Sequence, residues 1–377
     1  MQIHIVRPGD SLRAIALRYS VPAERISYVN QLSDPSRLSV GMALLIPTES
    51  RPPAASMAVN AYAYPNISAG VLEEYSPVLS FLCPFTHMID EGGRLSPLND
   101  ALLLESARQS GTAAWLSAAN LDPAGGFSPD IAHSILTDET AQNNFLEDCM
   151  RLLEEKGCAG LNLDLEYVYP FDKGSYNQFL ARLSRQLHAE GYYLSTALAP
   201  KTSAGQEGLL YSAHDYAAHG KYADYCVIMT YEWGYLYGAP QAVSPVNKMR
   251  QVLEYALSEM SGGKILMGFS NYAYNWTLPW RQGTPAQLLS NAAAQNLAAS
   301  TGAEVKFDRD AMAPYFNYTD SEGQRHIVWY EDARSVRARL ALVPEYGLGG
   351  ISIWNINRLY RVLTEYLKNE YMTDKYI

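Results

Sequence analysis

Eight short apolar runs, spaced like the strands of successive βα units, constrain the fold of this 377-residue chain more than any other feature. They begin near Ala58, Val78, Ala113, Gly160, Tyr193, Tyr225, Ile265 and Gly350. Most consecutive starts lie roughly 20–47 residues apart, with helical spacing of apolar residues between them. Eight alternations of strand and helix are the pattern of a parallel barrel with right-handed crossovers. We therefore predict an α/β fold, a (β/α)8 TIM barrel, over residues 57–377.

The interval before the last run is about twice as long as the others. It holds strand-like segments at Val305–Phe307, Tyr315–Tyr318 and His326–Tyr330, with Asp320 to Gly323 as a hairpin turn. We predict a small α+β insertion between the seventh and eighth barrel strands, approximately at residues 277–345.

The first 48 residues follow a separate pattern, which predicts a βααβ module. The expected elements are a strand at Ile3–Val6, a turn at Pro8–Asp10, helices at Ser11–Tyr19 and Pro22–Asn30, and a strand at Met42–Ile46. Residues 49–56, ESRPPAAS, combine two prolines with small polar residues and are predicted to be a linker.

This segment resembles the LysM module. The matching residues are Val6-x-Pro8-Gly9-Asp10-Ser11-Leu12, Ile15-Ala16, Tyr19, Val21, Asn30, Leu38, Gly41 and Leu45-x-Pro47. The resemblance implies a shallow groove for N-acetylglucosamine-containing glycans. The residues expected there are Gly9, Asp10, Ser11 and Leu12 in one loop, and Gly41 in the loop that begins at Ser39. A generic docking module is the alternative.

The segment from Gly160 to Glu166, GLNLDLE, carries the clearest chemical signal. In a strand, its alternation places Asn162, Asp164 and Glu166 on one face and three leucines on the other. Inside a barrel the acids would point inward, with Glu166 at the carboxyl-terminal mouth where barrel enzymes act. Burial and mutual repulsion would raise the pKa of one carboxyl group, leaving a protonated acid near neutral pH. A structural acid pair that holds a loop is the alternative.

This strand resembles the active-site strand of glycoside hydrolase family 18, whose pattern is D-G-x-D-x-D-x-E. Gly160, Asp164 and Glu166 match, whereas Ala159 and Asn162 stand where the pattern has acids. The resemblance implies that Glu166 is the proton donor and that Asp164 orients the acetamido group of the substrate. It also implies substrate-assisted retaining catalysis, in which the substrate's 2-acetamido oxygen attacks the anomeric carbon.

Two further strand ends resemble the same family. Met229-Thr230-Tyr231-Glu232 looks like its M-x-Y-D element, with Glu232 in place of Asp, and implies that Tyr231 is a third catalytic residue. Trp354 ends the eighth strand and matches the tryptophan beneath the sugar. The expected substrate-binding residues are Asn162, Glu232, Trp233, Asn271, Tyr272 and Trp354, with Tyr274 as a further candidate.

Three longer stretches narrow the resemblance. Residues 231–234, 271–276 and 328–335, together with the LysM pattern, are similar to the spore-germination subgroup of cortical fragment-lytic N-acetylglucosaminidases. The resemblance implies cleavage of β-1,4 bonds at N-acetylglucosamine in spore-cortex peptidoglycan by a spore-associated enzyme.

Several alternatives stay open. The substrate could be chitin or chitooligosaccharides, or Glu232 could act as the nucleophile of a conventional two-carboxylate hydrolase. A catalytically inactive glycan-binding spore-coat protein is a third possibility. His214-Asp215 lacks an accompanying Ser or Cys nucleophile motif, so we interpret it as structural.

Composition excludes other classes of function. With 29 basic and 39 acidic residues, the net charge of −10 disfavours binding to nucleic acid or an anionic membrane. The excess of 28 tyrosines over nine phenylalanines suits an aromatic-lined groove for a polar ligand. Metal and nucleotide motifs are missing: there is no CxxC, HExxH, P-loop or GxGxxG. We expect no cofactor, metal, obligate protein partner, membrane-spanning segment or classical signal peptide.

Overall fold

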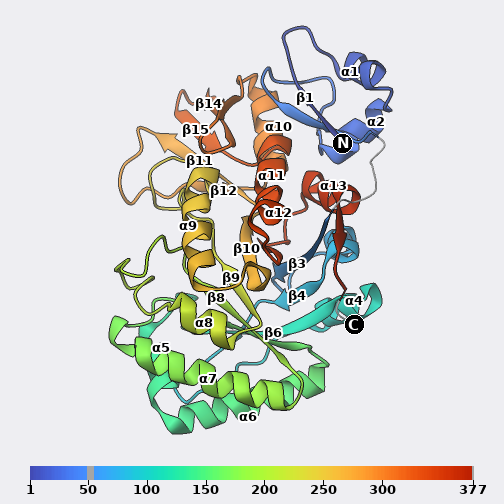
Figure 1. Ribbon diagram of the computed structural model, residues 1–377. Helices are drawn as coiled ribbons and strands as arrows, with labels where there is room; N and C mark the ends of the chain where they lie inside the picture. The colour runs from blue at the N-terminus through green and yellow to red at the C-terminus, as the bar shows by residue number, and fades with distance from the viewer. Residues whose placement is uncertain (49–54, 376–377) are drawn as a thin grey trace.

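The computed structural model describes residues 1–48 and 55–375. Figure 1 shows the N-terminal module in blue at one end, the orange insertion beside it, and the barrel below both. Most of the predicted linker, residues 49–54, lies outside the described residues. Its last two residues, Ala55 and Ser56, are not linker but begin a barrel strand. They pair there with Tyr371 and Met372 of a short C-terminal strand.

The prediction of an eight-stranded parallel barrel is confirmed. Pairing of the eighth strand with the first, Gly350 opposite Ala58, closes the sheet. The strands are β3 (Ala55–Ala63), β4 (Phe81–Pro84), β6 (Ala113–Ala119), β7 (Gly160–Asp164), β8 (Tyr193–Leu198), β9 (Tyr225–Ile228), β10 (Ile265–Ser270) and β16 (Gly350–Trp354). The second strand begins at Phe81 and not at Val78, because Ser76–Val78 forms a 3-10 turn that contains a proline.

Helices cover the outside of the barrel. They are α3 (Ala69–Tyr75), α4 (Ala101–Ser110), α5 (Pro129–Thr137), α6 (Glu139–Lys156), α7 (Lys173–Ala189), α8 (Tyr216–Tyr222), α9 (Val246–Glu259), α11 (Ala333–Leu340), α12 (Leu342–Tyr346) and α13 (Arg361–Glu370). In α7, Tyr176, Leu180, Leu183 and Leu187 recur at helical spacing and are fully buried. The leucines of β7 belong to the same apolar core, so its polar residues must face inward.

The lower barrel interior is filled by aromatic side chains. Phe81 and Trp115 lie 4.7 Å apart between ring centroids, and Tyr225 lies 5.7 Å from Trp115. This packed layer closes the barrel below, and polar chemistry is therefore confined to the strand ends above it.

The predicted insertion is a five-stranded antiparallel sheet with one helix. Its elements are β11 (Ala273–Leu278), β12 (Gln287–Leu289), α10 (Asn291–Thr301), β13 (Lys306–Asp308), β14 (Ala313–Thr319) and β15 (Arg325–Trp329), in the order β12-β11-β15-β14-β13. It begins near residue 273 and not 277, because β11 follows β10 almost directly. It ends at Trp329, since Val336 and Leu340 of α11 already pack in the barrel core.

The N-terminal module has the predicted βααβ order: β1 (Gln2–Ile5), α1 (Leu12–Tyr19), α2 (Ala23–Val29) and β2 (Ala43–Ile46). It shares an apolar cluster with the insertion, in which Met42 and Leu44 join Ala298 and Val305. The module is therefore docked by a common core and does not stand apart.

Polar contacts reinforce this docking on two sides. Toward the insertion, the Val305 N–H donates to the Val40 carbonyl at 2.9 Å and the Ser39 hydroxyl donates to the Ala298 carbonyl at 2.8 Å. Toward the barrel, Arg25 forms an ion pair with Glu365 of α13 at 2.7 Å.

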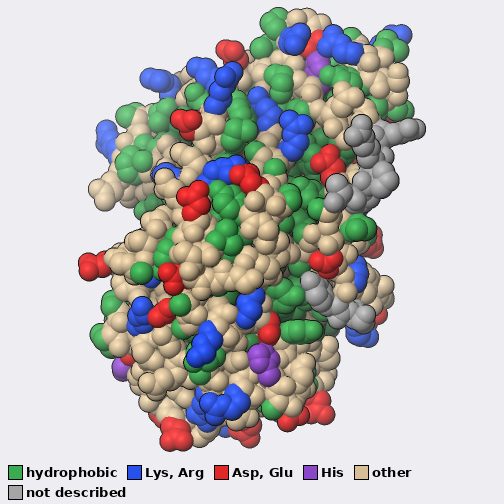
Figure 2. All heavy atoms as spheres, viewed as in Figure 1, with side chains coloured by type: hydrophobic (Ala, Val, Ile, Leu, Met, Phe, Trp, Pro, Cys, Tyr) green, Lys and Arg blue, Asp and Glu red, His purple; other side chains and the backbone are tan. Residues whose placement is uncertain are grey.

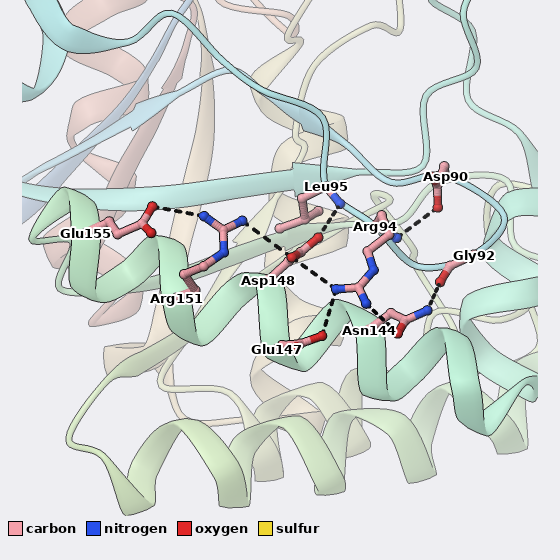
Figure 3. A network of polar contacts seen from close by, with 9 residues as sticks. All are labelled: Asp90, Gly92, Arg94, Leu95, Asn144, Glu147, Asp148, Arg151 and Glu155. Carbon is pink, nitrogen blue, oxygen red and sulfur yellow. Dashed lines mark hydrogen bonds and ion pairs between the residues drawn. The ribbon is translucent and has the colours of Figure 1, made fainter.

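A second network fixes the loop between β5 (His87–Met88) and α4. Arg94 donates to Glu147, Asn144 and Asp148 of α6 at 2.8, 2.9 and 3.2 Å, and Asp148 also accepts from the Leu95 N–H (Figure 3). The Arg94 pairs are half-exposed, so they orient the loop more than they stabilise the fold.

The surface carries mixed charge. Figure 2 shows acidic and basic side chains interspersed over one face of the molecule. Within residues 1–48 and 55–375, no helix is both long and apolar enough to cross a membrane. In the same part of the chain, no group of three or more His, Cys, Asp or Glu side chains converges as a metal site would require.

Candidate active site

A two-lobed cleft opens at the carboxyl ends of the barrel strands. The first lobe, of about 510 Å³, is lined by Asp164, Glu166 and Tyr231 among others. The second lobe, of about 610 Å³, contains none of these three residues. The lobes share Glu232 and Trp354, so these two residues mark their junction.

Asp164, the last residue of β7, forms the floor of the first lobe. Its side chain is only 4% exposed, and burial raises the pKa of its carboxyl group. Its Oδ1 atom is buried with no hydrogen-bond partner among the described residues. A buried polar atom without a partner is rare in proteins and calls for an explanation. A donor group of a bound ligand would supply the missing partner.

Glu166 lies two residues further, half-buried in the same lobe. Burial raises the pKa of its carboxyl group well above the ordinary value, and the negative charges of Asp164 and Glu232 raise it further. All three effects favour the protonated form at neutral pH. This carboxyl group is therefore able to donate a proton to a bound ligand.

The backbone of Glu166 is held by a residue that sequence reasoning missed. The Asn120 side-chain oxygen accepts from the Glu166 N–H, and its amide donates to the Glu166 carbonyl, both at 2.9 Å. Asn120 is fully buried and directly follows β6. A polar residue immediately after a predicted barrel strand was the available signal.

His214 binds the backbone of Leu165, the residue between Asp164 and Glu166. Its Nδ1 accepts from the Ala199 N–H at 2.9 Å, so its Nε2 carries the proton and donates to the Leu165 carbonyl at 3.0 Å. Burial lowers the pKa of His214 to about 4 and keeps the ring neutral. The contact supports the structural interpretation of this histidine, because it orients the peptide between Asp164 and Glu166.

Tyr231 and Glu232 follow β9 and line the first lobe. Glu232 has a positive φ of 66° and accepts hydrogen bonds from the hydroxyls of Tyr272 and Tyr274, the latter at 3.2 Å. Burial raises the pKa of Glu232, and the two tyrosine hydrogen bonds oppose that rise. The segment that enters the insertion thus fixes a carboxylate of the barrel cleft.

Aromatic rings line the cleft. The half-buried Trp354 ring is braced edge-on by Phe85 and Tyr62, with centroids 4.8 and 5.4 Å away. Tyr167 and Tyr235 stand exposed at the rim of the first lobe, and Trp233 also lines it. Flat apolar faces with polar edges suit a pyranose, whose CH faces pack on rings while its hydroxyls stay hydrated.

Two asparagines predicted to bind substrate lie outside the cleft lining. Asn162 is fully buried, where its oxygen accepts from the Tyr62 hydroxyl at 2.9 Å and its amide donates to the Ser195 hydroxyl at 3.0 Å. The alternation of β7 predicted correctly that Asn162 faces the barrel interior, but not how far it lies from the cleft. Asn271 is 2% exposed, and its amide donates to the carbonyls of Asn355 and Arg358. Both residues are buried and bind neighbouring parts of the chain that support the walls of the site. Of the other predicted residues, Tyr272 lines the second lobe.

The residues expected to bind glycan in the N-terminal module separate into two groups. Gly9 and Ser11 are exposed, and Asp10 accepts from the His4 side chain, whereas Leu12 is buried. Gly41 faces the insertion: a Cβ atom placed on it would lie 2.0 Å from the Val305 carbonyl oxygen. Gly41 therefore contacts the insertion and does not line an open groove, contrary to the prediction.

Two neighbouring carboxyl groups at a strand end, one buried and one half-buried, in an aromatic cleft of a (β/α)8 barrel, fit a glycosidase. The chain belongs to the glycosyl hydrolases family 18, whose model matches residues 124–358, and a LysM domain matches residues 4–47. These matches confirm the family, the fold and the enzyme class that the sequence predicted.

Similar proteins cover nearly the whole chain. It is 40% identical over 411 residues to the "Cortical fragment-lytic enzyme" of Bacillus subtilis (strain 168), across 94% of this chain and 95% of that protein. The crystal structure of the Bacillus megaterium QM B1551 spore cortex-lytic enzyme SleL superposes with a TM-score of 0.93 at 29% identity, across 100% and 99% of the two chains. For the Bacillus cereus SleL structure, the TM-score is 0.82 at 38% identity, across 99% and 87%.

Proposed function

We propose that this protein hydrolyses β-1,4 bonds at N-acetylglucosamine in spore-cortex peptidoglycan by substrate-assisted retaining catalysis. The observation that carries the proposal is the unpartnered buried Oδ1 of Asp164 beside Glu166, whose raised pKa keeps it protonated. An acetamido N–H is the donor that an N-acetylated sugar would bring to this atom. The similarity to cortical fragment-lytic enzymes supports the choice of polymer.

The first half of the reaction uses both carboxyl groups, those of Glu166 and Asp164. Glu166 donates its proton to the glycosidic oxygen as the bond to the anomeric carbon breaks. The 2-acetamido oxygen of the same sugar attacks that carbon and forms a cyclic oxazolinium ion. Asp164 accepts the acetamido N–H, and the Tyr231 hydroxyl donates to the acetamido oxygen. This placement makes the attack intramolecular, which removes much of its entropic cost.

The second half reverses the roles. Glu166, now a carboxylate, takes a proton from water as the water attacks the anomeric carbon and opens the ring. Two displacements on that carbon leave its configuration unchanged. Because the nucleophile belongs to the substrate, Glu232 does not form a bond to the sugar in this scheme.

The test is a pair of matched substitutions. Glu166→Gln preserves shape but has no proton to give, so we expect kcat on cortex fragments to fall roughly 10²–10⁴-fold with folding unchanged. Glu232→Gln should keep far more activity, and no 2-fluoro sugar should label Glu232. A thiazoline mimic of the oxazolinium ion should inhibit competitively, and substrates with a free 2-amino group should resist hydrolysis. Near wild-type turnover by Glu166→Gln, or covalent capture of Glu232, would replace this mechanism.

We further propose a spore-associated location and a glycan-contacting role for the exposed loop from Gly9 to Ser11 of the LysM module. The match to the LysM domain and the spore enzymes among the relatives support both. Substituting this loop should weaken sedimentation with insoluble cortex and leave turnover of soluble fragments unchanged. Unaltered sedimentation would show that this loop does not bind glycan.

A further inference from the structure

The second lobe of the cleft contains a cation that has no ion-pair partner among the described residues. Among the described residues that line either lobe, Arg358 is the one Lys or Arg side chain. It is half-buried, and its guanidinium forms no ion pair or hydrogen bond with any other residue in the described part of the chain. The charges that share the cleft are acidic, and the chain as a whole carries −10.

The backbone around Arg358 is fixed before any ligand arrives. Its carbonyl accepts from the Asn271 amide at 2.8 Å and from the Tyr75 hydroxyl at 3.2 Å. The preceding residue, Asn357, accepts from the Tyr64 N–H at 2.8 Å. The planar guanidinium on this braced backbone offers a rigid fork of donors, which is the geometry that binds a carboxylate through two hydrogen bonds.

The position of Arg358 relative to the reacting bond follows from the two lobes. The second lobe includes Trp354, on which the reacting sugar is proposed to rest, but neither Asp164 nor Glu166. The bond that breaks lies beside Glu166. A sugar in the second lobe is therefore the neighbour of the reacting sugar on the side away from the leaving group.

Neutral chitin offers this cation hydroxyl and amide oxygens but no negative charge. In peptidoglycan, by contrast, N-acetylglucosamine alternates with muramic acid, which carries a lactyl ether that ends in a carboxyl group. Resting on the function proposed above, we infer that Arg358 binds a carboxylate carried by the muramic sugar next to the reacting N-acetylglucosamine. The carboxylate is the lactyl group where no peptide is attached, and a peptide carboxylate where one is. Arg358 is thus a substrate-binding residue that favours peptidoglycan over chitin.

The experiment compares Arg358→Gln with wild type on defined tetrasaccharides. One substrate has free lactyl groups, a second carries a stem peptide, a third has lactyl methyl esters, and chitotetraose has no carboxylate. We expect kcat/KM of the variant to fall roughly 10–100-fold on the free-lactyl substrate, mainly through KM, because a charge-assisted pair is lost. The loss on chitotetraose and on the methyl ester should stay below about threefold. Arg185→Gln on α7, an equal charge change at an exposed site, should change none of these values.

The outcomes separate the inference from the proposed function. A loss confined to the peptide-bearing substrate would assign the carboxylate to the peptide and not to the lactyl group. Equal losses on all four substrates would show that Arg358 only supports the loop, and no loss on either acidic substrate would overturn the inference. If the wild type cleaves none of them, the proposed function fails. Calorimetric binding of the same sugars to wild type and Arg358→Gln then still decides whether the carboxylate is bound.

Discussion

Protonation of His214 should break its hydrogen bond from the Ala199 N–H and destabilise the fold. The ring is fully buried, and burial lowers its pKa from 6.5 to about 4. Because the folded pKa lies below the unfolded one, the neutral ring contributes its full stability above about pH 6.5 and loses it as the pH falls toward 4. At about 1.4 kcal/mol per pH unit, the loss is about 3 kcal/mol.

His214→Gln isolates this contribution. At pH 7 the variant should be less stable than wild type, because the hydrogen bonds to Ala199 and Leu165 are disturbed. As the pH falls to 4, wild type should lose about 3 kcal/mol more than the variant, so the two free energies of unfolding converge. Urea titrations at pH 7, 6, 5 and 4 measure the difference, in which the other titrating groups largely cancel.

The control is His133→Gln, at a side chain that is 47% exposed and paired with Asp172. This substitution exchanges the same residue types at a half-exposed site, so it measures the effect of the substitution itself. A difference between His214→Gln and wild type that stayed constant from pH 7 to 4 would refute the reasoning. It would mean that His214 is not held neutral by the fold.

Two further substitutions test the supports of the site and the module. Asn120→Ala should lower kcat roughly 10–100-fold with a smaller change in KM, because it leaves both backbone groups of Glu166 unpaired. Activity close to wild type would show that Asn120 does not position the acid. Gly41→Ala should lower the free energy of unfolding by roughly 2–4 kcal/mol, since its Cβ would meet the Val305 carbonyl and its φ is +84°. Gly9→Ala, at φ +83° in open space, carries only the backbone cost and should destabilise less.

Local sequence patterns were enough to predict most of the fold and the two carboxyl groups at the centre of the site. The spacing of eight apolar runs set the barrel, and alternation from Gly160 to Glu166 placed both carboxyl groups inward. Alternation names a face, however, and not a height along the barrel axis, so it could not show that Asn162 lies below the cleft. Asn271 was misplaced for a related reason: its partners, Asn355 and Arg358, follow the next barrel strand more than 80 residues later.

Contacts between distant segments account for what sequence reasoning missed. Asn120 acts on Glu166 only because β6 and β7 are neighbours in the closed sheet. Gly41 matches a glycan-binding loop in its local sequence, yet the insertion, some 260 residues away, covers it. Local sequence describes each partner in such a pair, and only the tertiary fold brings the two together.

The shared core between the N-terminal module and the insertion fixes the distance between the module and the active site. A module on a flexible tether lets a catalytic domain sweep a volume set by the length of the linker. Here Ser39, Val40 and Arg25 fasten the module on two sides, so its exposed loop keeps one offset and one orientation relative to Glu166. If that loop holds a glycan, Glu166 can reach only the glycosidic bonds that lie at this fixed distance from the loop.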